Sequence, residues 1–162
     1  MDHWMRVGCS ALITGTVASV VSTAALALLA KAERKGALQP TNATSHWLHG
    51  DEAARHYEVD AAHTLLGYGT HHASAVFWAV PFEMWLAARP PPTLAAMLRD
   101  ACVMSAIAAA VDYGATPKRL TPGWELVLSK EAMTAAYGAM ALGLAGGALV
   151  AHAWLGKQRD SA

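Results

Sequence analysis

Histidines and carboxylates are concentrated in one polar segment of the chain and in the apolar stretch that follows it. His46 and His49 lie one helical turn apart, and Asp51 follows them closely. On a helical turn the two imidazoles would share a face, which suits a metal ion. His63 and His72 continue the series along the chain. Nitrogen and carboxylate ligands together suit zinc, nickel, iron or copper.

Two further carboxylates, Asp112 and Glu131, flank the polar connection at residues 114–123 and are expected on the same side as the histidines. The sequence thus predicts a polar funnel, with loop histidines and acids at its mouth and His72 deeper. Neither an HExxH motif nor a CxxC pair selects a particular metal, and solvated loop histidines are the alternative interpretation. The candidate metal ligands are His46, His49, Asp51, His63, His72, Asp112 and Glu131.

Ionisable groups inside apolar stretches need a partner, a cavity or a function, because a bilayer does not solvate them. Folding the chain about the turn at residues 88–92 brings Glu83 level with Arg99. Folding it about residues 114–123 brings Asp112 level with Lys130. We interpret these as two ion pairs that tie helices together, and a proton or ion path is the alternative.

One face of the second apolar stretch is expected to point into the protein. His72 and Glu83 share this face, since about 11 residues make almost three helical turns. His71 is expected on the adjoining face. An imidazole near mid-membrane can be a neutral hydrogen-bond partner, a proton relay or a metal ligand.

Four apolar stretches must position these groups. They cover residues 7–29, 61–87, 93–113 and 126–155, in a chain of 162 residues that is 54% hydrophobic and only 15% charged. A helix needs about 20 apolar residues to cross the hydrocarbon core. The third stretch is the weakest, because Arg99 and Asp100 interrupt it. The predicted fold is therefore all-α: one domain over residues 1–162, an integral membrane four-helix transmembrane bundle with a polar, histidine-rich loop at residues 30–60.

Four crossings would place both termini and the turn at residues 88–92 on one side, with the two polar loops on the other. Lysines and arginines are divided too evenly between the sides to set the orientation. Small residues at helical spacing predict close helix contacts in lipid, in a bundle or a homo-oligomer. They are Gly15, Ser19, Ser22 and Ala25 in the first stretch and Gly138, Gly143, Gly146 and Gly147 in the fourth.

Composition and motifs exclude several classes of protein. Twelve basic residues balance twelve acidic ones, so no electrostatic footprint for nucleic acid exists. Cys9 and Cys102 lie inside apolar stretches, without the paired spacing of a zinc site or disulfide framework. No phosphate-binding glycine loop and no Gly-x-Ser-x-Gly elbow occurs. We therefore expect no catalytic or cofactor-binding residues beyond the metal candidates, and an enzyme with histidine and carboxylate acid–base groups is the least favoured class.

Residues 63–135 contain a set of scattered residues that together form a pattern: His63, His72, Phe77-Trp78-Ala79-Val80, Thr116-Pro117, Pro122, Trp124-Glu125, Ser129 and Glu131. This pattern resembles the YagU-type bacterial inner-membrane proteins. It implies a bacterial inner-membrane location and a four-helix body, and it carries no biochemical activity.

Two functional hypotheses follow from the sequence. The first is a binding or transport module that handles protons or a metal ion, using histidines and carboxylates on the loop side of the second helix. The second is a structural or accessory subunit of a membrane complex, whose buried charges tie its helices together. Both place the chain in a lipid bilayer.

Overall fold

Four long helices form the body of the protein. The computed structural model describes residues 2–90 and 92–160, with side chains as far as residue 157. The long helices are α1 (His3–Ala32), α4 (Leu66–Ala87), α5 (Leu94–Gly114) and α6 (Lys130–Asp160). No strand occurs among the described residues, so the predicted all-α class is confirmed. Each predicted apolar stretch coincides with one long helix; Pro91, in the predicted turn, lies outside the described residues.

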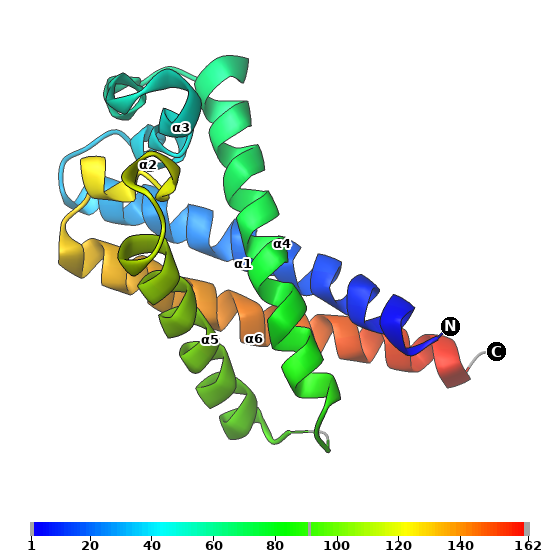
Figure 1. Cartoon of the computed structure of the whole chain (residues 1–162). Helices are drawn as coiled ribbons and strands as arrows, with labels where there is room; N and C mark the ends of the chain where they lie inside the picture. Colours follow the sequence, from blue (N-terminus) through cyan, green and yellow to red (C-terminus); the bar gives the residue numbers. More distant parts are fainter. Residues whose placement is uncertain (1, 91, 161–162) are drawn as a thin grey trace.

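Two polar connections fold together at one end of the body, and we call residues 33–65 and 115–129 the loop unit. Figure 1 shows it beside the end of α1 and the start of α4. Gly123 holds its two halves together: φ is +80°, and a Cβ there would lie 2.4 Å from the carbonyl oxygen of Ala43. Only glycine fits such a position. The short elements are α2 (Gln39–Ala43), α3 (His46–His49), a π-helical turn (Ala61–Leu65) and 3₁₀ turns at Asp51–Arg55, Lys118–Leu120 and Trp124–Leu126.

Helices α1 and α6 pack side by side in opposite directions, which brings the two ends of the chain together (Figure 1). A Cβ on Gly143 would lie 2.6 Å from Ala18 Cα, and one on Gly147 would lie 2.6 Å from Thr14 Cα. These two glycines allow the close approach that the small-residue pattern predicts. Gly138 and Gly146 make no such contact within the chain, since nothing lies within 4 Å of an added Cβ among the described residues, and for them a contact in a homo-oligomer stays a prediction.

Helix α4 crosses α1 and α6 steeply instead of lying along them (Figure 1). The crossing is tight, because a Cβ on Gly15 would lie 2.5 Å from Val76 Cα. Helix α4 packs much more extensively on α1 than on α5, its neighbour in sequence. This arrangement decides which side chains can contact Glu83, the buried carboxylate of α4.

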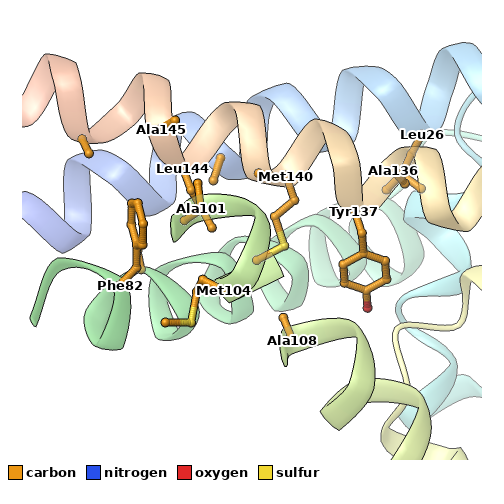
Figure 2. Close-up of a cluster of buried hydrophobic side chains, with 14 of the residues drawn as sticks. Leu26, Phe82, Ala101, Met104, Ala108, Ala136, Tyr137, Met140, Leu144 and Ala145 are labelled. Carbon is orange, nitrogen blue, oxygen red and sulfur yellow. The ribbon is translucent and has the colours of Figure 1, made fainter. Parts of the chain in front are cut away.

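The core lies where α1, α4 and α5 pack around α6. Figure 2 shows Phe82 of α4 near Met104 of α5, and Tyr137 of α6 near Ala108 of α5. Alanines occupy many of the contact positions, which lets the helices approach closely. The hydroxyl of Tyr137 is the polar end of this otherwise apolar layer.

Three helices are long and apolar enough to cross a membrane: α1, α5 and residues Lys130–Lys157 of α6. Helix α4 does not reach the same hydropathy. The expectation that the third stretch is the weakest is therefore wrong. Arg99 and Asp100 lie near the beginning of α5 and leave a long apolar run after them, whereas α4 carries His71, His72 and Glu83 along its length.

Candidate functional site

Two histidines and one carboxylate converge at the entrance to α4. Asp60 Oδ2 lies 2.9 Å from His56 Nε2 and 3.1 Å from His63 Nδ1. The rings of His56 and His63 are stacked with centroids 4.0 Å apart. One potential ligand atom from each residue lies within 4.8 Å of the others, and all three side chains are half-buried. We call these three residues the His–Asp triad.

His56 and Asp60 are close to each other but do not form a hydrogen bond. His56 Nε2 is buried and makes no hydrogen bond among the described residues, although Asp60 Oδ2 is 2.9 Å away. The nitrogen therefore lies beside the carboxylate in a poor hydrogen-bonding direction. Ligand atoms about 2.0–2.1 Å from a tetrahedral zinc ion are ~3.3 Å apart. Asp60 Oδ2 lies at about this separation from each of the two histidine nitrogens, so the three residues can supply ligands to one ion once the stacked rings turn apart.

The buried side chain of Asn42, in α2, positions the triad. Asn42 Nδ2 donates to the carbonyl oxygens of His56 (2.9 Å) and Glu58 (3.2 Å). Asn42 Oδ1 accepts from Thr64 Oγ1 at 2.7 Å. All three contacts fix backbone or side chains on either side of Asp60. The triad is thus attached to α2 instead of being free in solvent.

Asp60 caps the π-helical turn that carries His63. Its Oδ1 accepts from the backbone N–H of His63 at 2.6 Å. This hydrogen bond, the one from the His63 ring and attraction by His56 lower the pKa of Asp60 from 3.8 to about 2. The carboxylate therefore stays charged, and able to bind a metal, through mildly acidic conditions.

This pKa predicts how the turn responds to acid. A carboxyl whose pKa is lowered in the folded state stabilises that state above its ordinary value of 3.8 and loses the effect as the pH falls towards 2. We expect the His63 amide to be protected from hydrogen exchange at pH 5 and to lose protection between these two values. An Asp60→Asn variant should show no such transition, and an identical transition in the variant would contradict the assignment.

The structure separates most of the predicted ligands. His46 is buried, and its Nε2 lies 2.9 Å from the carbonyl oxygen of Thr121, so it joins the two halves of the loop unit. Asp51 is exposed, and its closest contact with His46 is 3.7 Å. His46 and His49 occupy α3 together but face different neighbours, so the predicted shared metal-binding face is wrong. His49 packs beside the triad instead, with its ring 4.6 Å from that of His63.

Three other predicted ligands lie away from the triad. His72 is half-buried within α4, and its Nδ1 has no hydrogen-bond partner among the described residues. Its neighbour His71 is the inward one, with Nε2 2.9 Å from Ser22 Oγ, so the predicted order of the two faces is reversed. Asp112 accepts from the Tyr137 hydroxyl at 2.6 Å. Glu131 is exposed in the first turn of α6.

Sequence inspection predicted His63 but did not select His56 or Asp60. The spacing of His56, Asp60 and His63 was visible, at positions i, i+4 and i+7. In the structure this segment is not one helix, because an extended stretch leads into the π-helical turn at Asp60. The spacing of these three residues therefore predicts a shared site only if the π-helical turn at Asp60 is known.

Both predicted ion pairs are replaced by other contacts. Glu83 accepts from Thr14 Oγ1 at 2.5 Å and lies 2.9 Å from His152 Nε2. Arg99 binds the adjacent Asp100 at 2.8 Å, and Arg89, in the connection after α4, binds the same carboxylate at 3.2 Å. Helices α4 and α5 are thus tied near their turn by different residues.

The second predicted pair is absent among the described residues, since Asp112 contacts Tyr137 instead of Lys130. Both residues of the predicted pair lie near helix ends, where a shift of one turn is enough to change the partner. Helices α5 and α6 are accordingly linked by the hydrogen bond from the Tyr137 hydroxyl to the Asp112 carboxylate.

Fold and site together define an all-helical protein with three candidate membrane-spanning helices and a polar loop unit at one end. Comparisons with protein-family models, curated proteins and solved structures return no match. The resemblance of residues 63–135 to the YagU-type proteins stays a prediction.

Proposed function

We propose that the chain is a bacterial inner-membrane protein that crosses the bilayer four times and binds a divalent transition-metal ion in its loop unit. Convergence of His56 Nε2, Asp60 Oδ2 and His63 Nδ1 carries the metal assignment. Imidazole nitrogen with one carboxylate is a zinc-type ligand set, and a fourth position stays open for water or a further ligand.

The fourth crossing is supported by the distribution of polarity around α4. Its 22 residues span ~33 Å, enough for the hydrocarbon core. The groups that lower its hydropathy include Glu83 and His71, which are only 2% and 8% exposed. Phe77, Val80 and Met84 are among its exposed side chains. Glu83 and His71 thus meet other helices, and apolar groups are available to lipid.

Accessibility of single cysteines tests the topology. We expect Tyr57→Cys in the loop unit and Ala88→Cys after α4 to react with a membrane-impermeant maleimide from opposite faces of sealed vesicles. Both positions are exposed, and Cys9 and Cys102 are replaced by serine in the background. Labelling of both cysteines from the same face would show that α4 does not cross.

Zinc titration of the full-length protein tests the metal site. The protein is purified in detergent without a histidine tag and titrated by calorimetry. We expect one zinc ion per chain, and at least about tenfold weaker binding for His56→Ala, Asp60→Asn and His63→Ala, since removing even groups that only support a ligand costs that much. Cobalt should give the intense visible absorption of a tetrahedral site.

The matched control is His3→Ala, which removes an exposed histidine at the opposite end of the protein. Its zinc affinity should equal that of the parent. Equal affinity in the three triad variants, or no zinc uptake by the parent, would overturn the metal assignment. The transport of metal across the membrane is a separate question, which zinc flux into vesicles would answer.

A further inference from the structure

An aromatic cavity lies where the loop unit meets α4, α5 and α6. Its volume is about 180 Å³. The side chains that give it its chemistry are Trp47, Trp78, Trp124, Tyr137, His71 and Asp112. We propose that this cavity binds a small organic cation with a single ammonium group. The triad contributes no residue to its lining, so this site is distinct from the proposed metal site.

The size of the cavity limits the ligand to a few non-hydrogen atoms. A cavity of ~150 Å³ in a protein core is enough to hold benzene. A volume of about 180 Å³ therefore accommodates a group such as tetramethylammonium or a short alkylammonium. Larger amphipathic molecules do not fit without separating α4 from α5.

The group in this cavity that can form an ion pair with a cation is a carboxyl. Asp112 is its one carboxylate, and no lysine or arginine lines it among the described residues. The Tyr137 hydroxyl donates to Asp112 Oδ2, whereas Oδ1 has no hydrogen-bond partner in the described part of the chain. A half-buried carboxylate with one free oxygen favours a cationic ligand.

Other charged groups lie around the rim. Glu125 accepts from Thr121 Oγ1 and adds negative potential beside Asp112. Arg119 is exposed and donates to the backbone carbonyl of Trp47, on the outside of the loop unit. His71 Nε2 is already engaged with Ser22 Oγ. The strongest interaction still available inside the cavity is therefore with Asp112.

Two of the three tryptophans, Trp47 and Trp124, supply ring surface and no free polar group. The N–H of Trp47 donates to Thr70 Oγ1 (3.2 Å), and that of Trp124 donates to Thr44 Oγ1 (3.3 Å). The part of these two side chains that remains available to a ligand is the π surface of the indole ring. Indole rings attract cations more strongly than other aromatic rings, and desolvation strengthens the attraction. A neutral molecule of the same shape gains no such interaction.

A second hollow adjoins the cavity between α4 and α5. It shares Thr70, Ser74, Trp78 and Asp112 with the aromatic cavity and extends to Thr116. Its lining joins the Asp112 carboxyl and three hydroxyl groups to apolar side chains that include Phe77 and Val111.

The experiment compares choline with its neutral isostere 3,3-dimethyl-1-butanol. Both are titrated into full-length protein in detergent, with tryptophan fluorescence and calorimetry as readouts and sodium chloride at equal ionic strength as the blank. We expect choline and tetramethylammonium to bind, and the neutral alcohol to bind at least about tenfold more weakly. Equal binding of choline and the alcohol would overturn the inference.

Variants locate the site. Asp112→Asn keeps an acceptor for Tyr137 but removes the charge, and it should weaken choline binding about tenfold or more, as expected for loss of a charged partner. Trp78→Leu should weaken it as well, and is informative if the first variant fails to fold. Glu131→Gln and Trp154→Leu are matched controls at exposed positions, with unchanged affinity expected.

Two further results separate this site from the triad. His63→Ala and removal of metal by a chelator should leave choline binding unchanged. Unchanged choline affinity in both Asp112→Asn and Trp78→Leu would place the ligand elsewhere and overturn the inference.

Discussion

Replacing His152 by leucine is expected to destabilise the protein by about 3–5 kcal/mol, although leucine suits a membrane helix better than histidine. His152 Nε2 lies 2.9 Å from Glu83 Oε2, and Glu83 is only 2% exposed. Without the imidazole, the carboxylate keeps Thr14 as its one hydrogen-bond partner. Because the side chain of His152 is itself 42% exposed, we expect the lower end of that range.

A double variant distinguishes the loss of a charge partner from a packing defect. In Glu83→Gln/His152→Leu no buried charge is left at this site, and the glutamine oxygen can still accept from Thr14. We expect this protein to be more stable than His152→Leu alone, because an unpaired buried charge costs more than a lost pair. Midpoints of unfolding in mixed detergent micelles measure the difference.

The control for the double variant is Glu131→Gln, which neutralises an exposed acid in the same helix and should leave the midpoint unchanged. A double variant that is less stable than His152→Leu would contradict the charge-pair explanation. It would show instead that side-chain packing at this end of α4 dominates.

Replacing Gly147 by alanine is expected to destabilise the protein by about 2–3 kcal/mol, in the range of an overpacked core position. The added Cβ would lie 2.6 Å from Thr14 Cα and 2.8 Å from the Thr14 carbonyl oxygen. Both are backbone atoms, so α1 as a whole must move away from α6. The shift also displaces the hydroxyl that Thr14 donates to Glu83.

The adjacent glycine is a matched control. Gly146→Ala adds the same methyl group one residue earlier, where nothing lies within 4 Å among the described residues. Alanine is favoured over glycine within a helix by about 0.5–1 kcal/mol. We therefore expect Gly146→Ala to raise the unfolding midpoint slightly and Gly147→Ala to lower it. Equal effects of the two substitutions would contradict the close α1–α6 contact.

These two sites belong to one region of the fold. Thr14 contacts Gly147 through its backbone and Glu83 through its hydroxyl, and Glu83 then reaches His152, five residues beyond Gly147 on α6. The region joins α1, α4 and α6 at the end opposite the loop unit. It holds the helices together, while the triad and the aromatic cavity lie at the other end.

Prediction of the local elements from sequence worked well where a local pattern was sufficient. Apolar runs predicted the four long helices, because helix formation and burial depend on nearby residues. The pattern of Gly143 and Gly147 predicted a close helix contact, since a repeat of four residues places both on one face. The histidine-rich loop was correctly placed beside the start of the second long helix.

Side-chain partners could not be predicted in the same way. The predicted pair of Glu83 and Arg99 assumed that helices adjacent in sequence pack along each other. Helix α4 instead crosses α1 and α6, so Glu83 meets Thr14 and His152, each 69 residues away in the chain. A steep crossing angle cannot be deduced from composition, because it depends on which glycines meet which backbones.

The sequence by itself determined that the chain is helical, that most of its long helices suit a membrane, and that histidines gather beside the second of them. Only the tertiary structure decided which histidines converge. His56 and His63 meet at Asp60 because Asn42, from another helix, binds the backbone before Asp60 and the Thr64 side chain within the π-helical turn. Local sequence sets helix and polarity through neighbours in the chain, whereas a ligand set is made by contacts between segments that only folding brings together.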